Sequence, residues 1–322
     1  MFKLRSDTWI IIYLNILRLL GVLPCTWEYR KPKLGSQTTT SGIKKVNLSF
    51  KILFLSVFGH VFILFVNIFT TNKSLFSIMT IYNYLLSSTM IDTIYIFNTM
   101  FAVYYFFLVL AMIIKARGLL KVFMKNDIFF TTQWDTCGIT MFFIAIMISI
   151  CVNFSTSIFN FVRIGLGIIE AVTIYIVPSI CALFSNLYVL LFYFCSKTIG
   201  NGWKNIEFEK KELSRNTPSQ NHAIFHMEKA ARNASYLNSL QKDINEIFTE
   251  TISLIISFSL CMCIASLFGL ISEIRDDIYA TCGTASGVFF CITIFILCCN
   301  SSRTSEIQGI HYVYLDCTLI AY

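Results

Sequence analysis

The chemically most informative residues are polar side chains set inside long apolar stretches of the sequence. Tyr95 and Asn98 lie in one such stretch, and Glu170, Thr173 and Tyr175 lie in another. Hydroxyl, amide and carboxylate groups of this kind can orient a small organic molecule inside an otherwise apolar cleft. We therefore take these five residues as the candidate ligand-binding site.

The elements that carry these residues follow from the composition. Of the 322 residues, 56% are hydrophobic and only 13% are charged, about half the charged share of a soluble domain. A soluble protein of this length could not bury so much apolar surface. The aromatic content of 16% also excludes a disordered chain. We expect an all-α, polytopic transmembrane helix bundle.

Six stretches have the length and hydropathy of a membrane-spanning helix, which needs about 20 apolar residues. They are continuously apolar and do not alternate with a period of two, so helices are favoured over barrel strands. The six stretches are 53–71, 93–114, 139–161, 167–195, 248–271 and 281–299.

Each candidate ligand residue also has a structural explanation. Glu170 lies near the start of its stretch, where a carboxylate can stay hydrated at the level of the lipid headgroups. Tyrosine and asparagine side chains, Tyr104 and Tyr105 among them, also form hydrogen bonds between helices or an interfacial aromatic belt. Glu250 lies at the entrance of a span, and we expect it either to cap the helix or to pair with a basic loop residue.

Three small or rigid residues are expected to shape the bundle. Pro178 lies in the middle of a span and removes a backbone donor, which predicts a kink. Gly283 and Gly287 are four residues apart and form a smooth surface for close helix approach.

The distribution of lysine and arginine predicts the orientation, since these residues are retained on the cytoplasmic side. Most of them fall before residue 53, within 115–125 and within 197–242, whereas Lys73, Arg163 and Arg275 stand alone in the alternate loops. Both termini are therefore expected inside the cell. The predicted organisation is a cytoplasmic segment (1–52), four spans (53–195), a cytoplasmic loop with a helical extension (196–247), two spans (248–299) and a tail or the start of a seventh helix (300–322).

Three further segments carry more specific expectations. The short apolar run 9–23 contains Arg18 and predicts an amphipathic helix lying on the membrane surface. The stretch 197–219 is polar and is predicted to be a loop. From about His222 onwards, apolar residues at helical spacing predict a cytoplasmic helix that continues into the fifth span, with an apolar stripe that packs either on its own bundle or on another subunit. The stripe comprises Leu237, Leu240, Ile244, Ile247 and Phe248.

Several other kinds of chemistry find no support in the sequence. Most of the 12 cysteines lie in spans or cytoplasmic segments, and the four histidines are too scattered for a metal site. No phosphate loop, zinc-protease motif or nucleophile elbow is present. We expect no enzyme, no metal and no cofactor. The net charge of +7 follows from the loop asymmetry, so we expect no nucleic-acid partner.

The layout resembles the insect gustatory receptor family, whose members are inverted heptahelical chemoreceptors. Residues 17–24, Leu-Arg-Leu-Leu-Gly-Val-Leu-Pro, are similar to a segment that precedes the first span in that family. The extended helix before the fifth span, with Leu237, Asp243 and Phe248, is similar to the family's anchor region. Cys299-Asn300-Ser301 and Ser305-Glu306 resemble the segment that leads to the family's seventh helix.

The resemblance implies a taste receptor in the plasma membrane, a ligand-gated cation channel opened by a small-molecule tastant. It also implies a homo- or hetero-tetramer of related subunits surrounded by membrane lipid. The chain departs from the family after residue 322, where the pore-lining seventh helix with its Thr-Tyr…Gln-Phe motif would follow. The alternatives are a small-solute transporter, for which no internal repeat is evident, and an accessory membrane subunit without its own ligand.

Overall fold

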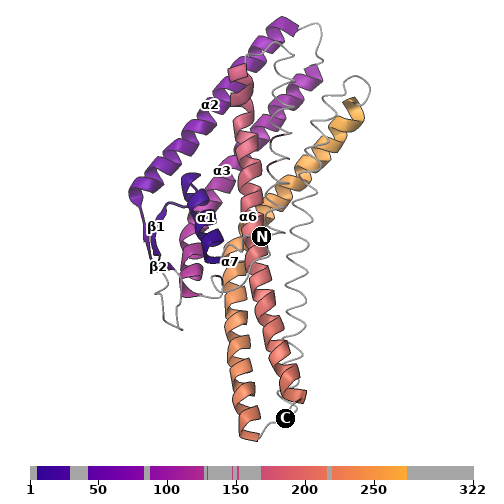
Figure 1. The fold of residues 1–322 in the computed structure, drawn as a ribbon. Helices are drawn as coiled ribbons and strands as arrows, with labels where there is room; N and C mark the ends of the chain where they lie inside the picture. Colours follow the sequence, from indigo (N-terminus) through magenta and orange to yellow (C-terminus); the bar gives the residue numbers. More distant parts are fainter. Residues whose placement is uncertain are drawn as a thin grey trace.

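The protein is described from a computed structural model, which is mostly helical over the residues it describes. These are residues 6–29, 43–82, 88–126, 168–215 and 220–273, with the isolated positions 129, 147 and 151. Their elements, in chain order, are α1 (Ser6–Leu19), β1 (Cys25–Tyr29), β2 (Ile43–Leu48), α2 (Phe50–Tyr82), α3 (Ser88–Lys125), α6 (Ile168–Arg215) and α7 (Gln220–Glu273) (Figure 1).

Four of the described helices are long and apolar enough to cross a membrane. The prediction of a mostly helical chain with membrane-length apolar helices is therefore confirmed, and these four overlap the first, second, fourth and fifth predicted spans. The third and sixth predicted spans lie outside the described residues, apart from positions 147 and 151. The four segments are Phe50–Lys73, Thr99–Met124, Ile176–Ile206 and Glu228–Cys261.

The four helices differ in how much of their surface the protein itself covers. In the most apolar window of α2 only 11% of the residues are buried, against 56% in α6. Phe54, Phe58, Phe65 and Phe69 of α2 are all exposed. Because these exposed side chains lie on a membrane-length helix, they are suited to contact with lipid hydrocarbon. Helix α6 is central and α2 is peripheral.

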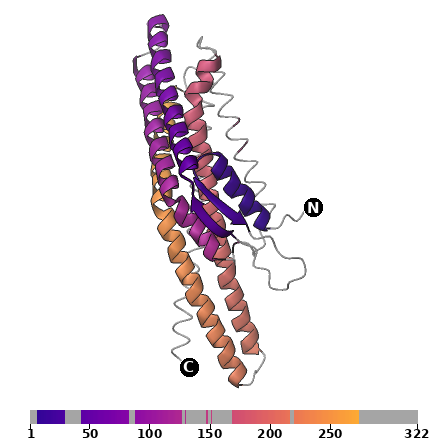
Figure 2. The same ribbon diagram turned by 90° about the vertical axis from the view of Figure 1, so that its left-hand side faces the viewer.

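Helices α6 and α7 continue far beyond the length of a span. They contain 48 and 54 residues, which correspond to about 72 and about 81 Å at 1.5 Å per residue. Their adjoining halves run side by side as a stalk below the rest of the molecule, and their other halves diverge, with α7 lying along α3 (Figures 1 and 2). The predicted helix leading into the fifth span is confirmed.

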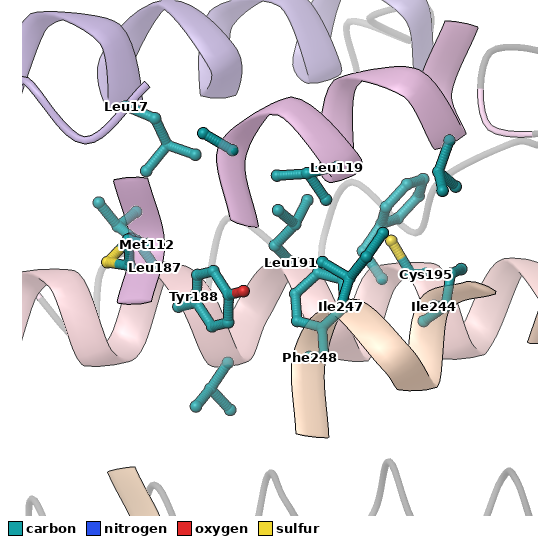
Figure 3. Packing of buried hydrophobic residues seen from close by; sticks show 14 of the residues in the cluster. Leu17, Met112, Leu119, Leu187, Tyr188, Leu191, Cys195, Ile244, Ile247 and Phe248 are labelled. Carbon is teal, nitrogen blue, oxygen red and sulfur yellow. The ribbon is translucent and has the colours of Figure 1, made fainter. Parts of the chain in front are cut away.

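The stalk corrects one prediction. The stretch 197–219, expected to be a loop, is helical as far as Arg215. Ile199, Trp203 and Ile206 recur at spacings of four and three and are all buried, so this polar segment has one apolar face that packs. Figure 3 shows the same type of packing higher up, where side chains of α6 and α7, including Leu191 and Ile247, meet in the core.

Two further loops predicted from charge are also helical. Helix α2 continues through Lys73 to Tyr82, and α3 continues through the basic stretch from Lys115 to Lys125. Leu119, Leu120 and Phe123 of α3 are buried in the core cluster. The apolar face of α3 therefore persists beyond the membrane-spanning length, and the charges occupy the other side.

Helix α1 confirms the predicted short helix but corrects its surroundings. Ile10, Leu14 and Leu17 are almost fully buried in the core cluster, so this apolar face contacts protein and does not rest on lipid. The Tyr13 hydroxyl donates a hydrogen bond to the backbone carbonyl of Leu187 on α6. Burial raises the pKa of Tyr13 well above its ordinary value, which keeps the donor protonated.

The end of α1 is a Schellman cap. The amide of Val22 donates to the carbonyl of Leu17 at 3.1 Å, and the amide of Gly21 donates to the carbonyl of Arg18 at 3.0 Å. Gly21 has a φ of 74°, which a residue with a Cβ adopts only with strain. The cap turns the chain into the antiparallel hairpin of β1 and β2, and β2 contacts α3.

Candidate functional site

The five candidate ligand residues lie on two helices that contact each other. Tyr95 and Asn98 belong to the first third of α3, and Glu170, Thr173 and Tyr175 belong to the first two turns of α6. The first turns of α3 and α6 lie at the end of the molecule opposite the stalk (Figure 1). The side chains of these five residues lie outside the described part of the structure, so their joint site stays a prediction.

Of the three residues expected to shape the bundle, the structure describes only Pro178. Pro178 lies inside α6, which continues on both sides of it, and it cannot donate a hydrogen bond to the carbonyl of Ile174. Gly283 and Gly287 lie outside the described residues.

A compact aromatic and hydroxyl cluster lies further along both helices, about one turn beyond Asn98 on α3 and nearly three turns beyond Tyr175 on α6. The Tyr104 ring stacks on Phe258 of α7 with a centroid distance of 3.7 Å and an interplanar angle of 3°. Phe101 meets the same Phe258 ring edge-on at 5.2 Å. We call Phe101, Tyr104, Ser185 and Phe258 the aromatic floor, because they link α3, α6 and α7 directly beyond the predicted cleft.

Hydrogen bonds fix the position of the floor. The Tyr104 hydroxyl lies 2.5 Å from Ser185 Oγ, and both side chains are buried. Ser185 Oγ donates to the carbonyl of Cys181 on its own helix at 2.8 Å. Since the Ser185 proton is used there, the Tyr104 hydroxyl is the donor to Ser185 Oγ. The expected structural role for Tyr104, hydrogen bonding between helices, is confirmed.

A second cluster joins α2 to α3 and α6. His60 Nδ1 lies 2.5 Å from the Tyr105 hydroxyl, and the His60 ring meets Phe184 edge-on at a centroid distance of 5.9 Å. One turn earlier on α2, the Ser56 hydroxyl donates to the carbonyl of Gly21, the residue that caps α1. The α1 cap, α2 and α3 therefore meet through hydrogen bonds inside the bundle, and α6 joins them through an aromatic contact.

A third set of contacts ties α3 to α7 near the start of the stalk. Lys115 Nζ lies 2.9 Å from Glu250 Oε2 and donates to the carbonyl of Glu246 at 3.4 Å. The prediction that Glu250 pairs with a basic residue is confirmed. Further along α3, the Tyr236 hydroxyl donates to Asn126 Oδ1 at 2.7 Å.

The sequence analysis missed the partners in these clusters. Ser185, Phe184 and Phe258 are ordinary residues within apolar stretches, and no local pattern marks them. His60 carried a usable signal, because an ionisable side chain inside a span requires a partner. Within the described part of the chain, no group of three histidine, cysteine or acidic side chains is arranged to hold a metal ion.

The clusters can transmit a displacement but contain no reactive group set for bond-making chemistry. A molecule that pressed on Phe101 or Tyr104 would move Phe258, and α7 is continuous from Phe258 to the stalk. No protein-family model matches the chain, and no curated protein matches it.

Proposed function

We propose that the chain is a chemoreceptor of the gustatory type, a plasma-membrane subunit of a ligand-gated cation channel with its N-terminus in the cytoplasm. Its ligand would be a small tastant bound by Tyr95, Asn98, Glu170, Thr173 and Tyr175. Its assembly would be a homo- or hetero-tetramer with related subunits in the lipid bilayer. The resemblance of the layout to the gustatory receptors and the loop charges support this proposal.

One observation carries the proposal furthest, the aromatic floor and its connection to α7. The floor lies on the same two helices as the predicted ligand residues, further along each, and its Phe258 belongs to the helix that also forms the stalk. From Phe258 to Glu250 the separation along α7 is about 12 Å, and Glu250 is held by Lys115 of α3. Ligand binding at one end can thus bias the relative positions of α3 and α7 at the other end.

The mechanism needs two arrangements of α7 relative to α3 and α6. A ligand shifts that equilibrium only if it binds one arrangement more tightly. Stacked rings and a single hydroxyl pair suit this role, since the Tyr104–Phe258 face can slide while the Tyr104–Ser185 hydrogen bond breaks and forms again. The ligand would contact the predicted residues differently in the two arrangements. The side chains of the aromatic floor would shift with that difference.

Ligand binding to the purified chain tests the site. Radiolabelled or fluorescent tastants from the sugar and bitter classes would be titrated against the wild type, Glu170→Gln and Tyr175→Phe. We expect a weaker affinity in both variants, because each loses one polar contact with the ligand. Val103→Ala, an exposed position on α3 away from the predicted residues, is the matched control.

Two outcomes would count against the proposal. Equal losses in Glu170→Gln, Tyr175→Phe and the Val103→Ala control would remove the assigned site. Saturable uptake of a labelled solute into vesicles, without tastant-dependent ion movement, would favour a transporter. Co-purification with a related receptor subunit, with no tastant binding in any combination, would favour an accessory subunit.

A further inference from the structure

A shallow apolar groove runs between α2 and α3 on the outer side of the bundle. Its volume is about 60 Å³, far smaller than the 300–1,000 Å³ of a typical small-molecule pocket. Val61, Phe106 and Leu110 on its walls are exposed, so the groove opens to the surroundings of two membrane-length helices. The groove is lined by Val57, His60, Val61, Leu64, Tyr105, Phe106, Val109, Leu110 and Ile113.

The surface inside the groove is almost entirely hydrocarbon, although two polar residues line it. His60 and Tyr105 bond to each other, at 2.5 Å between Nδ1 and the hydroxyl oxygen, which turns these atoms towards the helix interface. A polar ligand would find no partner there. A single flexible hydrocarbon chain matches the narrow shape and the apolar walls.

Basic side chains lie just beyond one end of the groove. On α3, Phe106, Leu110, Ile113 and Arg117 recur at spacings of four, three and four, so Arg117 continues the groove-lining row of the helix. Arg117 is exposed and lies about 6 Å beyond Ile113 along the axis. Lys121, also exposed, follows one turn later.

The start of α2 brings a third basic residue to the same end. Arg117 is close enough to Cys25 to act on its charge, and Cys25 pairs with Leu48 at the base of the hairpin. Ser49 follows and donates its amide to Pro24 at 3.0 Å, so α2 begins beside this point. Exposed Lys51 lies in the first turn of α2, about 9 Å along the axis before Val57.

The three basic residues are available to an external anion. Within the described residues, none of Lys51, Arg117 and Lys121 forms an ion pair, in contrast to Lys115, which is held by Glu250. The only described carboxylate on the hairpin, Glu28, lies opposite Lys45 in the strand register. The mouth of the groove is therefore positively charged.

We propose that this groove is a binding site for an anionic phospholipid. One acyl chain lies between α2 and α3 along Val57, Val61 and Leu110, and the headgroup phosphate contacts Arg117, with Lys51 and Lys121 beside it. Charge complementarity identifies the occupant, because a zwitterionic lipid gains less from three cations at the groove mouth. Loop charges put this end on the cytoplasmic side, where anionic lipids concentrate. The site does not depend on the chain being a chemoreceptor.

Retention of lipid by the full chain tests the proposal. The protein would be reconstituted in phosphatidylcholine containing a minor share of phosphatidylserine and purified again in detergent, and bound lipids would be quantified by mass spectrometry. The double variant Lys51→Gln and Arg117→Gln is expected to retain about 25-fold less phosphatidylserine, since each basic residue near a headgroup changes affinity about fivefold and two are removed. Phosphatidylcholine retention should change little.

A matched control separates the site from general charge. Lys204→Gln with Lys242→Gln removes the same charge from exposed positions on α6 and α7. This control should retain as much phosphatidylserine as the wild type does. Arg117→Lys keeps the positive charge, so this single variant should retain most of the phosphatidylserine that the wild type retains. Equal losses in the groove-mouth pair and the control pair would overturn the proposal.

A second variant tests the acyl-chain half of the site. Val61 is 52% exposed in the groove, and Val103 is 51% exposed outside its lining. Val61→Phe fills the groove and should lower retention of phosphatidylserine, whereas Val103→Phe should not. Equal retention in these two variants, or displacement of the lipid by inorganic phosphate alone, would refute a site that holds both a chain and a headgroup.

Discussion

The Tyr104–Ser185 pair makes an asymmetric prediction about stability. Ser185→Ala removes the acceptor at 2.5 Å from the buried Tyr104 hydroxyl but keeps the donor in place. Tyr104→Phe removes the donor, whereas Ser185 Oγ keeps its own bond to the carbonyl of Cys181 at 2.8 Å. The two substitutions delete the same hydrogen bond but leave different groups behind.

The expected magnitudes follow from this difference. Tyr104→Phe should cost about 0.5–1 kcal/mol of unfolding free energy, as for other side-chain hydrogen bonds between membrane helices. Its ring keeps the stacking on Phe258 at 3.7 Å. Ser185→Ala should cost about 1–3 kcal/mol, because the buried Tyr104 hydroxyl loses this acceptor. The double variant should cost less than Ser185→Ala alone, since the buried donor is then removed together with its acceptor.

The assay is a double-mutant cycle. Unfolding free energies of the wild type, both single variants and the double variant would be measured by denaturant titration in mixed micelles. The expected signature is a coupling in which Tyr104→Phe rescues part of the Ser185→Ala loss. If the two losses are equal and simply add, the hydroxyl of Tyr104 does not donate to Ser185 and the described floor is wrong.

Three further predictions concern the packing and the ion pair. Phe248→Ala, in the buried α6–α7 interface, should cost about 3–5 kcal/mol in the same titration, whereas Lys242→Ala at an exposed position of α7 should stay within about 0.5 kcal/mol. Gly21→Ala should lower the melting temperature, because φ is 74° and the new Cβ would lie 3.0 Å from Ser56 Oγ; unchanged melting would contradict the cap. Lys115→Glu should destabilise modestly, by about 0.5 kcal/mol, because Glu250 is 73% exposed, and adding Glu250→Lys should restore stability at low but not high salt.

The sequence predicts the class of fold better than the ends of its elements. Hydropathy alone places four membrane-length helices that the structure contains. The extension of α6 to Arg215 is missed because charges dominate its composition, and only Ile199, Trp203 and Ile206 reveal the face that packs. One buried face is enough to maintain a helix against a polar average.

The hydrogen-bond partner of a residue on another helix is harder to predict from sequence than the residue's own structural role. The sequence indicates that Tyr104 needs a hydrogen-bond partner inside a span, but Ser185 is 81 residues away along the chain. Helical periodicity identifies which face of α3 is buried and not which helix lies opposite. The apolar face of α1 has the same limitation, since Leu14 and Leu17 would fit a lipid surface as well as the protein core that buries them.

The arrangement of polar contacts suggests how the bundle is held together. Three clusters each join helices distant in sequence: Tyr104 with Ser185, His60 with Tyr105, and Lys115 with Glu250. Apolar packing against lipid provides little discrimination between helix partners in a membrane. These pairs therefore specify which helices meet.

Tastant-evoked cation current is the most direct measurement of the central claim. Cells that express the chain, alone and together with related receptor subunits, would be exposed to a panel of sugars and bitter compounds under voltage clamp. We expect an inward cation current that is reduced by Tyr175→Phe and by Tyr104→Phe and retained in Val103→Ala. A cell-surface protein that gives no current with any tastant in any subunit combination would contradict it.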